Sequence, residues 1–246
     1  MGADEIAVVG IASLLTSVLS AVAGLGGGII LLVVIAQFVA PTVAIPIQGV
    51  IQFASNGSRA VLVRRDISWP AVGWSALLVL PGSLVGVWLA TSIPEAALRL
   101  VLGVFVLVVA LRPSLLRWTS AERPSDRSMI GVGALSGFLN STVGASGPVT
   151  SPFFRAVTST HVAFVATAGA AQVLAHVAKL ISFTSTGFSV GDHLGVIGVG
   201  CLGVIVGSRI GTALLGRIPA RRLDVVFTVV LSALAIRLVV TALGDL

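Results

Sequence analysis

The chain has 246 residues, of which 56% are hydrophobic and 10% are charged, and its net charge is +6. Because a soluble domain of this size does not need so much apolar surface, the composition excludes one and predicts an all-α polytopic membrane protein. The apolar runs also exclude a transmembrane β-barrel, whose strands alternate over about 10 residues. The excess of basic residues is typical of loops on one side of a membrane, and no nucleic-acid partner is expected.

The first apolar run covers residues 6–39 and contains no charged residue. A straight helix of this length would far exceed the hydrocarbon core of a bilayer, which is roughly 30 Å thick. All but one of the residues 24–28 are glycine, and each glycine weakens a helix interior by about 1 kcal/mol. We therefore expect the run to break there, into an arm over 6–23 and a shorter arm over 29–39.

Helix-length spans and one polar linker make up the rest of the chain. The first half continues with spans over residues 41–63, 70–91 and 96–111. In the second half, an apolar run over 129–154 is interrupted at 144–148, and further spans cover 160–183, 194–215 and 221–243. We therefore divide the chain into a first membrane repeat at 1–113, a cytoplasmic linker at 114–128 and a second membrane repeat at 129–246.

The second half repeats residues of the first at a nearly constant offset, which predicts an internal duplication. Matches at an offset of 120 residues include Gly24 with Gly144, Gln52 with Gln172, and the basic pair Arg59 with Lys179. Matches at an offset of 125 include Gly82 with Gly207, Gly86 with Gly211, and Ile93-Pro94 with Ile218-Pro219. The glycine pairs spaced by four residues are expected to be packing faces between helices.

The distribution of basic residues predicts the topology. Arginines flank several spans, as at Arg64, Arg112 and Arg155, whereas the short connections at Glu95 and Asp192 are acidic. With the basic loops in the cytoplasm, both termini lie outside, provided that each broken segment returns to the side from which it came. Each half then has three crossings and one hairpin, and the two halves are inverted, as in transporters whose site lies between discontinuous helices. Whether the hairpins are re-entrant or fully spanning is left open.

The two glycine-rich breaks are the first candidate for a binding site. Where each second arm begins, at Gly28-Ile29 and Pro148-Val149, we expect backbone N–H groups without an intrahelical partner, and the helix dipole there favours an anion. Ser146 is a candidate cap, and a proline suits the first helical position. The expected ligands at the breaks are Gly26, Gly27, Gly28, Ser146, Gly147 and Pro148. The alternative is close helix packing through small residues.

A polar stripe follows each break, on one face of the next span. It consists of Gln48, Gln52, Asn56 and Arg59 in the first half, and of Gln172, His176 and Lys179 in the second. Because polar groups inside a membrane normally face a cavity or the bundle interior, we expect substrate contacts from Gln52, Asn56, Arg59, Gln172, His176 and Lys179. Interhelical hydrogen bonds are the alternative for the deeper residues, and snorkelling to the interface is the alternative for the arginine and the lysine.

The segment GASG at 144–147 also resembles the nucleophile motif of rhomboid-type intramembrane proteases. Such a serine needs a histidine on another span, which here would be His161 or His176. The repeat argues against this reading, because Ser146 corresponds to Gly26 while the flanking glycines are retained. We therefore expect no enzymatic activity, and no cofactor or metal.

Four motifs occur in a characteristic order: the glycine-rich break at 24–28, NGSR at 56–59, GASGP at 144–148, and Ile-Pro before the last span of each half. In these the chain resembles the TauE/SafE family of sulfite exporters and related anion permeases, over nearly its whole length. The resemblance implies a multi-pass inner-membrane protein that moves sulfite, sulfonates or other small organosulfur or carboxylate anions. The coupling ion, a proton or sodium, and the oligomeric state are left open.

Together these features predict an anion transporter, with export as the expected direction, that works by alternating access at a midplane site. The two breaks differ in chemistry, so an asymmetric anion with one charged and one organic end suits the site. One alternative is a passive anion channel, whose flux would not depend on a proton or sodium gradient. The other is a membrane scaffold that transports nothing.

Overall fold

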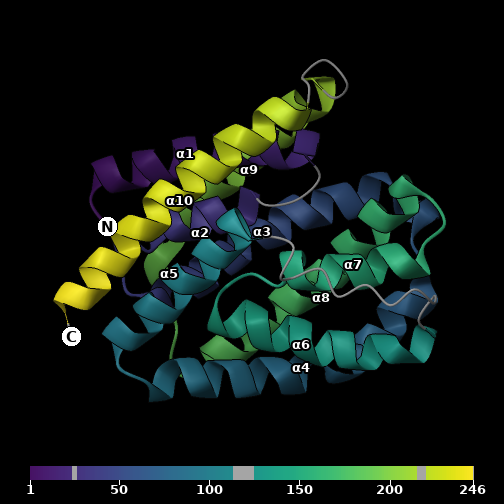
Figure 1. Cartoon of the computed structure of the whole chain (residues 1–246), viewed down its shortest axis with the longest axis horizontal. Coiled ribbons are helices and arrows are strands. Elements are labelled where there is room, and N and C mark those ends of the chain that lie inside the picture. The colour runs from purple at the N-terminus through teal and green to yellow at the C-terminus, as the bar shows by residue number, and fades with distance from the viewer. Residues whose placement is uncertain (24–26, 113–124, 215–219, 246) are drawn as a thin grey trace.

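The computed structural model describes residues 1–23, 27–112, 125–214 and 220–245, and this part of the chain is helical without strands (Figure 1). The first half contains α1 (Ala3–Ala23), α2 (Gly27–Ile35), α3 (Pro41–Leu62), α4 (Trp69–Ser92) and α5 (Glu95–Leu111). The second half contains α6 (Met129–Thr142), α7 (Gly147–Val157), α8 (His161–Thr184), α9 (Leu194–Leu214) and α10 (Ala220–Gly244). Short 3₁₀ turns at Arg64–Asp66, Asp126–Ser128 and Gly191–His193 precede α4, α6 and α9. The all-α class is therefore confirmed.

Both long apolar runs are interrupted where the glycines cluster, because α1 and α2 are separate helices and so are α6 and α7. In the second break, Gly144 has a φ of +69°, in the left-handed region that favours glycine. An added Cβ at this position would also strike the Leu32 side chain of α2. The predicted breaks are confirmed, and the second one brings the two halves of the chain into contact.

The second arm of each break is short. α2 has nine residues, or about 14 Å, and α7 has eleven, or about 17 Å, so neither crosses a bilayer by itself. α2 also ends earlier than the expected limit of residue 39, at Ile35. Hydrogen-bonded turns continue to Val39, and the backbone becomes extended at Ala40 because Pro41 follows it.

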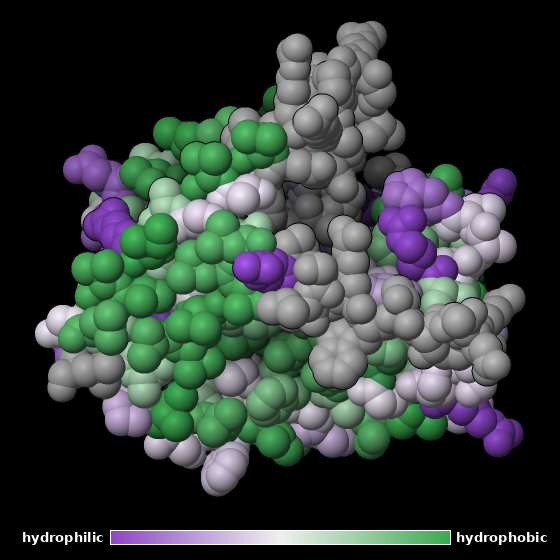
Figure 2. Space-filling model, viewed as in Figure 1, coloured by the Kyte–Doolittle hydropathy of each residue, from purple (hydrophilic) through white to green (hydrophobic). Residues whose placement is uncertain are grey.

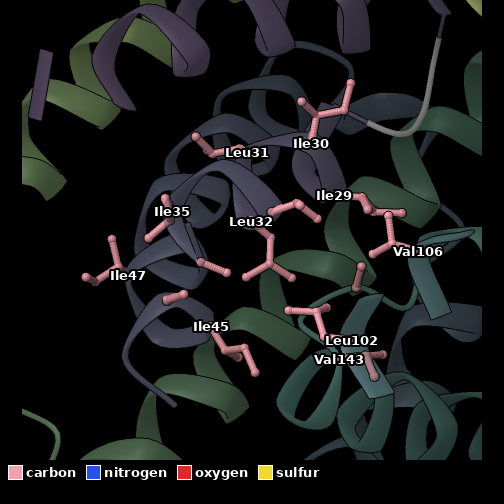
Figure 3. Packing of buried hydrophobic residues seen from close by; sticks show 14 of the residues in the cluster. Ile29, Ile30, Leu31, Leu32, Ile35, Ile45, Ile47, Leu102, Val106 and Val143 are labelled. Carbon is pink, nitrogen blue, oxygen red and sulfur yellow. The ribbon is translucent and has the colours of Figure 1, made fainter. Parts of the chain in front are cut away.

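The helix α2 lies inside the protein. Its Leu31, Leu32 and Ile35 side chains are fully buried, and they belong to a core that includes Ile45 of α3 and Leu102 of α5 (Figure 3). A helix that begins at membrane depth is tolerated where its free backbone groups are buried in protein or line a cavity. The packing around α2 therefore provides the surroundings that a broken helix needs.

The two halves pack through reciprocal pairs of helices. α1 packs along α9 and α4 along α6, so the first helix of each half contacts the fourth helix of the other, while α3 contacts α8 and α5 contacts α10. In Figure 1, α1, α9 and α10 lie at one edge of the molecule and α4 and α6 at the opposite edge. A Cβ on Gly82 would strike the Ala134 carbonyl oxygen, and one on Gly207 would strike that of Leu14. These glycines are packing faces, as expected.

The outside of the molecule is suited to lipid. Within the described residues, the helical segments long and apolar enough to cross a membrane are Ala3–Ser20, Trp69–Ser92, His161–Thr184 and Gly191–Gly211, and Thr228–Gly244 is a shorter apolar helix. Figure 2 shows hydrophobic side chains over much of the left and lower parts of one face, with most hydrophilic ones near its margins. Large apolar side chains such as Ile11, Trp88 and Leu202 are more than half exposed. The chain is therefore a multi-pass membrane protein.

Candidate functional site

A pocket of about 90 Å³ lies between the two breaks. It is lined by residues of α1, α2 and α3 from the first half and of α6, α7 and α8 from the second, together with the turn between α6 and α7. The predicted site residues that line it are Gly28, Gln52, Asn56, Arg59, Ser146, Gly147, Pro148, Gln172 and His176. The two breaks and the two polar stripes therefore meet at one cavity.

Three of the predicted ligands do not line this pocket. Gly27 is buried against α1, where an added Cβ would strike the Thr16 carbonyl oxygen. Lys179 is fully buried next to the pocket. Gly26 lies outside the described residues.

Ser146 occupies the N-cap position of α7, but its side chain does not cap that helix. Its Oγ accepts hydrogen bonds from Asn140 Nδ2 at 2.7 Å and from Gln172 Nε2 at 2.9 Å, and it lies 2.9 Å from Ser136 Oγ. Asn140 Nδ2 also donates to Gln172 Oε1 at 3.1 Å. The expected cap is therefore wrong, because these neighbours on α6 and α8 hold the serine side chain within the second break.

The second break also offers fewer free backbone N–H groups than predicted. Pro148 has none, and Val149 N–H donates to the Ser146 carbonyl oxygen at 3.0 Å, because α7 opens with a tight turn. Gly147 lines the pocket, and its N–H has no hydrogen-bond partner among the described residues. At the second break, side chains therefore supply more of the donors than helix-end amides do.

A chain of hydrogen bonds joins Arg59, Asn56 and His176 along the pocket. Arg59 Nη2 donates to Asn56 Oδ1 at 3.0 Å, and its Nη1 donates to Ser20 Oγ at 3.5 Å. Asn56 Nδ2 lies 3.3 Å from His176 Nε2. The other ring nitrogen of this histidine, Nδ1, is buried and has no partner within the described chain. The histidine itself is only 3% exposed.

Lys179 connects the two breaks. Its Nζ donates to Gln48 Oε1 at 3.0 Å, to Gly144 O at 3.4 Å and to Ile45 O at 3.5 Å. These three acceptors match the three donors of an ammonium group. Gln48 Nε2 in turn donates to the carbonyl oxygen of Gly28 at 3.2 Å. The lysine is therefore neither a pocket-lining ligand nor a snorkelling residue, but a buried link between Gly144 and Gly28.

No carboxylate faces this pocket. The sequence has no aspartate or glutamate at positions 6–65 or 127–191, which include every residue that lines it. Arg59 is therefore a guanidinium inside a span, without a carboxylate partner among the described residues. A guanidinium stays protonated in proteins, so the pocket carries a positive charge that no carboxylate of the described residues neutralises.

The family model of the sulfite exporter TauE/SafE matches residues 9–238 of the chain. The chain belongs to the TauE/SafE family of sulfite exporters. This confirms the resemblance, and the members of this family are membrane transporters of sulfite and related anions. The comparisons with curated proteins and with solved structures found no match.

The pocket of this TauE/SafE protein also contains polar residues that the sequence reasoning did not select. Asn140 and Ser20 both line it. They lie 120 residues apart, the offset at which the two halves match, so this offset was the signal that could have found them. Gln48 lines the pocket as well, although it was placed only in the polar stripe. The aromatic lining residues Phe154 and Phe164 had no distinguishing signal in the sequence.

The GASG segment of the TauE/SafE chain does not have the surroundings of a protease nucleophile. Ser146 is fully buried, and its side-chain partners are Ser136, Asn140 and Gln172. A nucleophilic serine needs a base within hydrogen-bond reach, and no histidine is among its partners in the described part of the chain. The arrangement therefore does not favour the protease alternative.

Proposed function

We propose that this TauE/SafE protein exports a small oxyanion, such as sulfite, a sulfonate or a related organosulfur or carboxylate anion, through the pocket between its two breaks. The proposal rests on one observation: the pocket contains the Arg59 guanidinium and no carboxylate. Leaving a charge partly buried and unpaired is unfavourable, and an anionic ligand offsets that cost. The site should therefore prefer an anion to a neutral or cationic solute.

In this proposal the oxygens of the substrate accept hydrogen bonds from groups that the protein leaves unpaired. Gln52 lines the pocket, and its amide makes no hydrogen bond to the described residues. Its Nε2 lies so close to Gly28 that a Cβ at that position would have to displace the Gln52 amide. Gly147 N–H and the remaining donors of Arg59 complete the set. Ser146 and Gln172 are bonded to each other and shape the opposite wall.

The lining has a second, apolar part that suits an organic group. Phe154, Phe164, Val165 and Ala168 line the pocket along α7 and α8. Apolar side chains offer no hydrogen bonds to a sulfur oxyanion, but they favour burial of a hydrocarbon tail. A sulfonate with a short apolar tail would therefore use both parts, which supports the asymmetric anion expected from the sequence.

The extent of the pocket supports a direction of access. Its lining continues along α3 as far as Arg59 and along α8 toward Phe164, near the helix ends that carry Arg64 and Arg155. The Arg155 guanidinium lies over the Phe164 ring, 4.5 Å from its centroid. Because basic ends of spans lie in the cytoplasm, we propose loading from that side, with the arginines attracting the anion. Rocking of one half against the other would then release it outside.

Flux of radiolabelled sulfite in proteoliposomes tests this proposal. Arg59→Gln keeps a polar side chain but removes the charge, and it should lower sulfite binding and flux by about tenfold or more. Arg112→Gln removes an exposed arginine at the end of α5 and should leave both unchanged. A folded wild-type protein that neither binds nor moves sulfite or methanesulfonate would contradict the proposal.

The dependence of flux on ion gradients separates an exporter from a passive channel. A coupled exporter loses net uphill transport when the proton or sodium gradient that drives it is collapsed. Flux that runs only downhill and does not depend on either gradient, in the same vesicles, would contradict coupled export.

A further inference from the structure

We propose that Arg59 and Asn56 hold His176 in the tautomer that carries its proton on Nδ1, and that this N–H donates to an oxygen of the substrate. The contact with the substrate rests on the proposed function, whereas the tautomer of His176 is a property of the protein without substrate. The observations that carry it are the orphaned, buried Nδ1 atom and the two hydrogen bonds that lead to the same ring. His176 lines the pocket, and its Nδ1 atom is buried beside it.

Arg59 fixes the orientation of the Asn56 amide. Its side chain lies 3.0 Å from Arg59 Nη2. A guanidinium has five N–H donors and no acceptor, so the asparagine atom that faces it must be the oxygen. The two ends of an amide have nearly the same shape, so the donors around it decide which atom is oxygen and which is nitrogen. The NH₂ group is left on the side of His176.

Asn56 in turn fixes the position of the proton on the imidazole ring of His176. The Asn56 NH₂ group lies 3.3 Å from His176 Nε2 and can only donate, so Nε2 must accept with a lone pair. In a doubly protonated ring, the Nε2–H of His176 would face an N–H of Asn56, so this contact also disfavours the doubly protonated form. A neutral imidazole with its lone pair on Nε2 carries its proton on Nδ1. Arg59 thus determines the tautomer through Asn56, as a positioning residue.

The Nδ1 proton of His176 needs an acceptor. Nδ1 is buried without a partner in the described chain, on a residue that is 3% exposed and lines the pocket. Buried donors are almost always hydrogen-bonded, so an unpaired one points to a missing acceptor. The sequence has no carboxylate at 127–191 or 6–65 to act as that acceptor. An oxygen of the bound anion is the acceptor that fits.

This arrangement has a consequence for specificity. Arg59, Gly147 N–H and His176 Nδ1–H all donate, so the ligand must accept at several oxygens. A fully deprotonated oxyanion such as a sulfonate does so. An alcohol, an amine or a protonated acid brings an N–H or O–H that would face another donor. The pocket should therefore discriminate against neutral relatives of its substrate.

Nitrogen-15 NMR of the full-length protein in lipid nanodiscs tests the tautomer directly. The chain has three histidines, and the spectrum of His176→Gln identifies the signals of His176 in protein labelled with ¹⁵N-histidine. At about pH 8, where histidine is neutral, we expect a protonated Nδ1 and a lone pair on Nε2 in the absence of substrate. A proton on Nε2 would overturn the inference, even if sulfite transport is intact.

Asparagine-to-aspartate variants test the role of Asn56. Asn56→Asp replaces the donor with an acceptor, so the His176 proton should move to Nε2 or both nitrogens should become protonated. Asn140→Asp makes the same change on a pocket residue that bonds to Ser146 and Gln172 and not to His176, so it should leave the tautomer unchanged. An unaltered His176 spectrum in Asn56→Asp would overturn the positioning role.

Binding of sulfite and of methanesulfonate tests the contact with the substrate. An asparagine amide nitrogen can occupy the place of Nδ1, whereas that of glutamine is closer to the place of Nε2. We therefore expect affinity within about threefold of wild type in His176→Asn and a loss of about tenfold or more in His176→Gln. Both anions should also shift the Nδ1 resonance of the wild type. The reverse order of affinities, or no shift on saturation, would overturn this contact while the proposed function stands. A wild type with the expected tautomer that binds neither anion would instead contradict the proposed function.

Discussion

Arg59 and Lys179 occupy matching positions of the two polar stripes, yet their surroundings differ. Arg59 reaches the pocket and retains donors for a ligand. Lys179 is fully buried and directs its donors to Gln48 and to the carbonyl oxygens of Ile45 and Gly144. The arginine can therefore recognise the charge of a substrate, while the lysine holds the two breaks in place.

Replacement of Lys179 tests this division of roles. Lys179→Met keeps the length of the side chain but leaves the Gly144 and Ile45 carbonyl oxygens with one hydrogen bond fewer, so we expect the free energy of unfolding to fall by about 1–3 kcal/mol. Denaturant unfolding in detergent measures it. Ile181→Met, on an outward-facing position of the same helix that is 51% exposed, should have almost no effect. Equal stability of both variants would contradict the structural role of the lysine.

Gly28 tests how closely the first break approaches the polar stripe. A Cβ at this position would strike Gln52 Nε2 and lie 3.3 Å from Gln48 Nε2. Gly28→Ala should therefore displace the Gln52 amide and weaken sulfite binding by about tenfold, which calorimetric titration can measure. Gly57→Ala, in α3 with nothing near its added Cβ, should bind as the wild type does and be more stable by up to about 1 kcal/mol. Unchanged binding in Gly28→Ala would contradict this geometry.

Helical spacing was sufficient to predict which side chains share a wall of the pocket. Gln52, Asn56 and Arg59 follow one face of α3, and all of them line the cavity. Spacing could not predict that Lys179 turns away from it, because its acceptors Ile45 and Gly144 come from distant segments. The role of such residues depends on tertiary contacts that the local sequence does not encode.

At the level of the helices, the breaks and the span limits follow from glycine, proline and hydropathy. α3 begins at Pro41 as expected, and α7 begins one residue before Pro148. The partners of each helix were not predictable in the same way. The pairing of α1 with α9 and of α4 with α6 depends on which small-residue faces meet, and many such faces occur in a chain with 28 glycines.

Alanine substitutions test the two reciprocal packing faces together. Gly82→Ala and Gly207→Ala each drive a Cβ into a backbone carbonyl oxygen of the neighbouring helix, so both should lower the free energy of unfolding by about 1–3 kcal/mol. Gly73→Ala in α4 and Gly198→Ala in α9 are matched controls with nothing near the added Cβ. If Gly82→Ala and Gly207→Ala were as stable as their control variants, the close approach of these helices would be contradicted.

For the whole molecule, the duplication, its inversion and the sidedness of the loops stay predictions. The reciprocal helix pairs, and the meeting of Asn56 with His176 at an offset of 120 residues, are what a duplicated chain would produce. The membrane class was predictable because composition alone determines it. The relative orientation of the halves was inferred from the charge of the loops and not from the packing of the bundle.

Labelling of single cysteines in intact cells tests the topology. The chain has one cysteine, so Cys201→Ser provides the background. A membrane-impermeant maleimide should label Gly2→Cys and Asp192→Cys from outside, and it should label Arg65→Cys only after the membrane is permeabilised. Labelling of Arg65→Cys in intact cells would contradict the predicted orientation.

The position of a bound oxyanion tests the account most directly. Selenite is a heavier analogue of sulfite, and its selenium can be located by anomalous X-ray scattering in crystals of the protein. We predict a peak in the pocket between Gly28 and Gly147, within hydrogen-bond reach of Arg59 and His176. A single peak elsewhere, or an empty pocket in protein that transports sulfite, would show that the two breaks do not form the binding site.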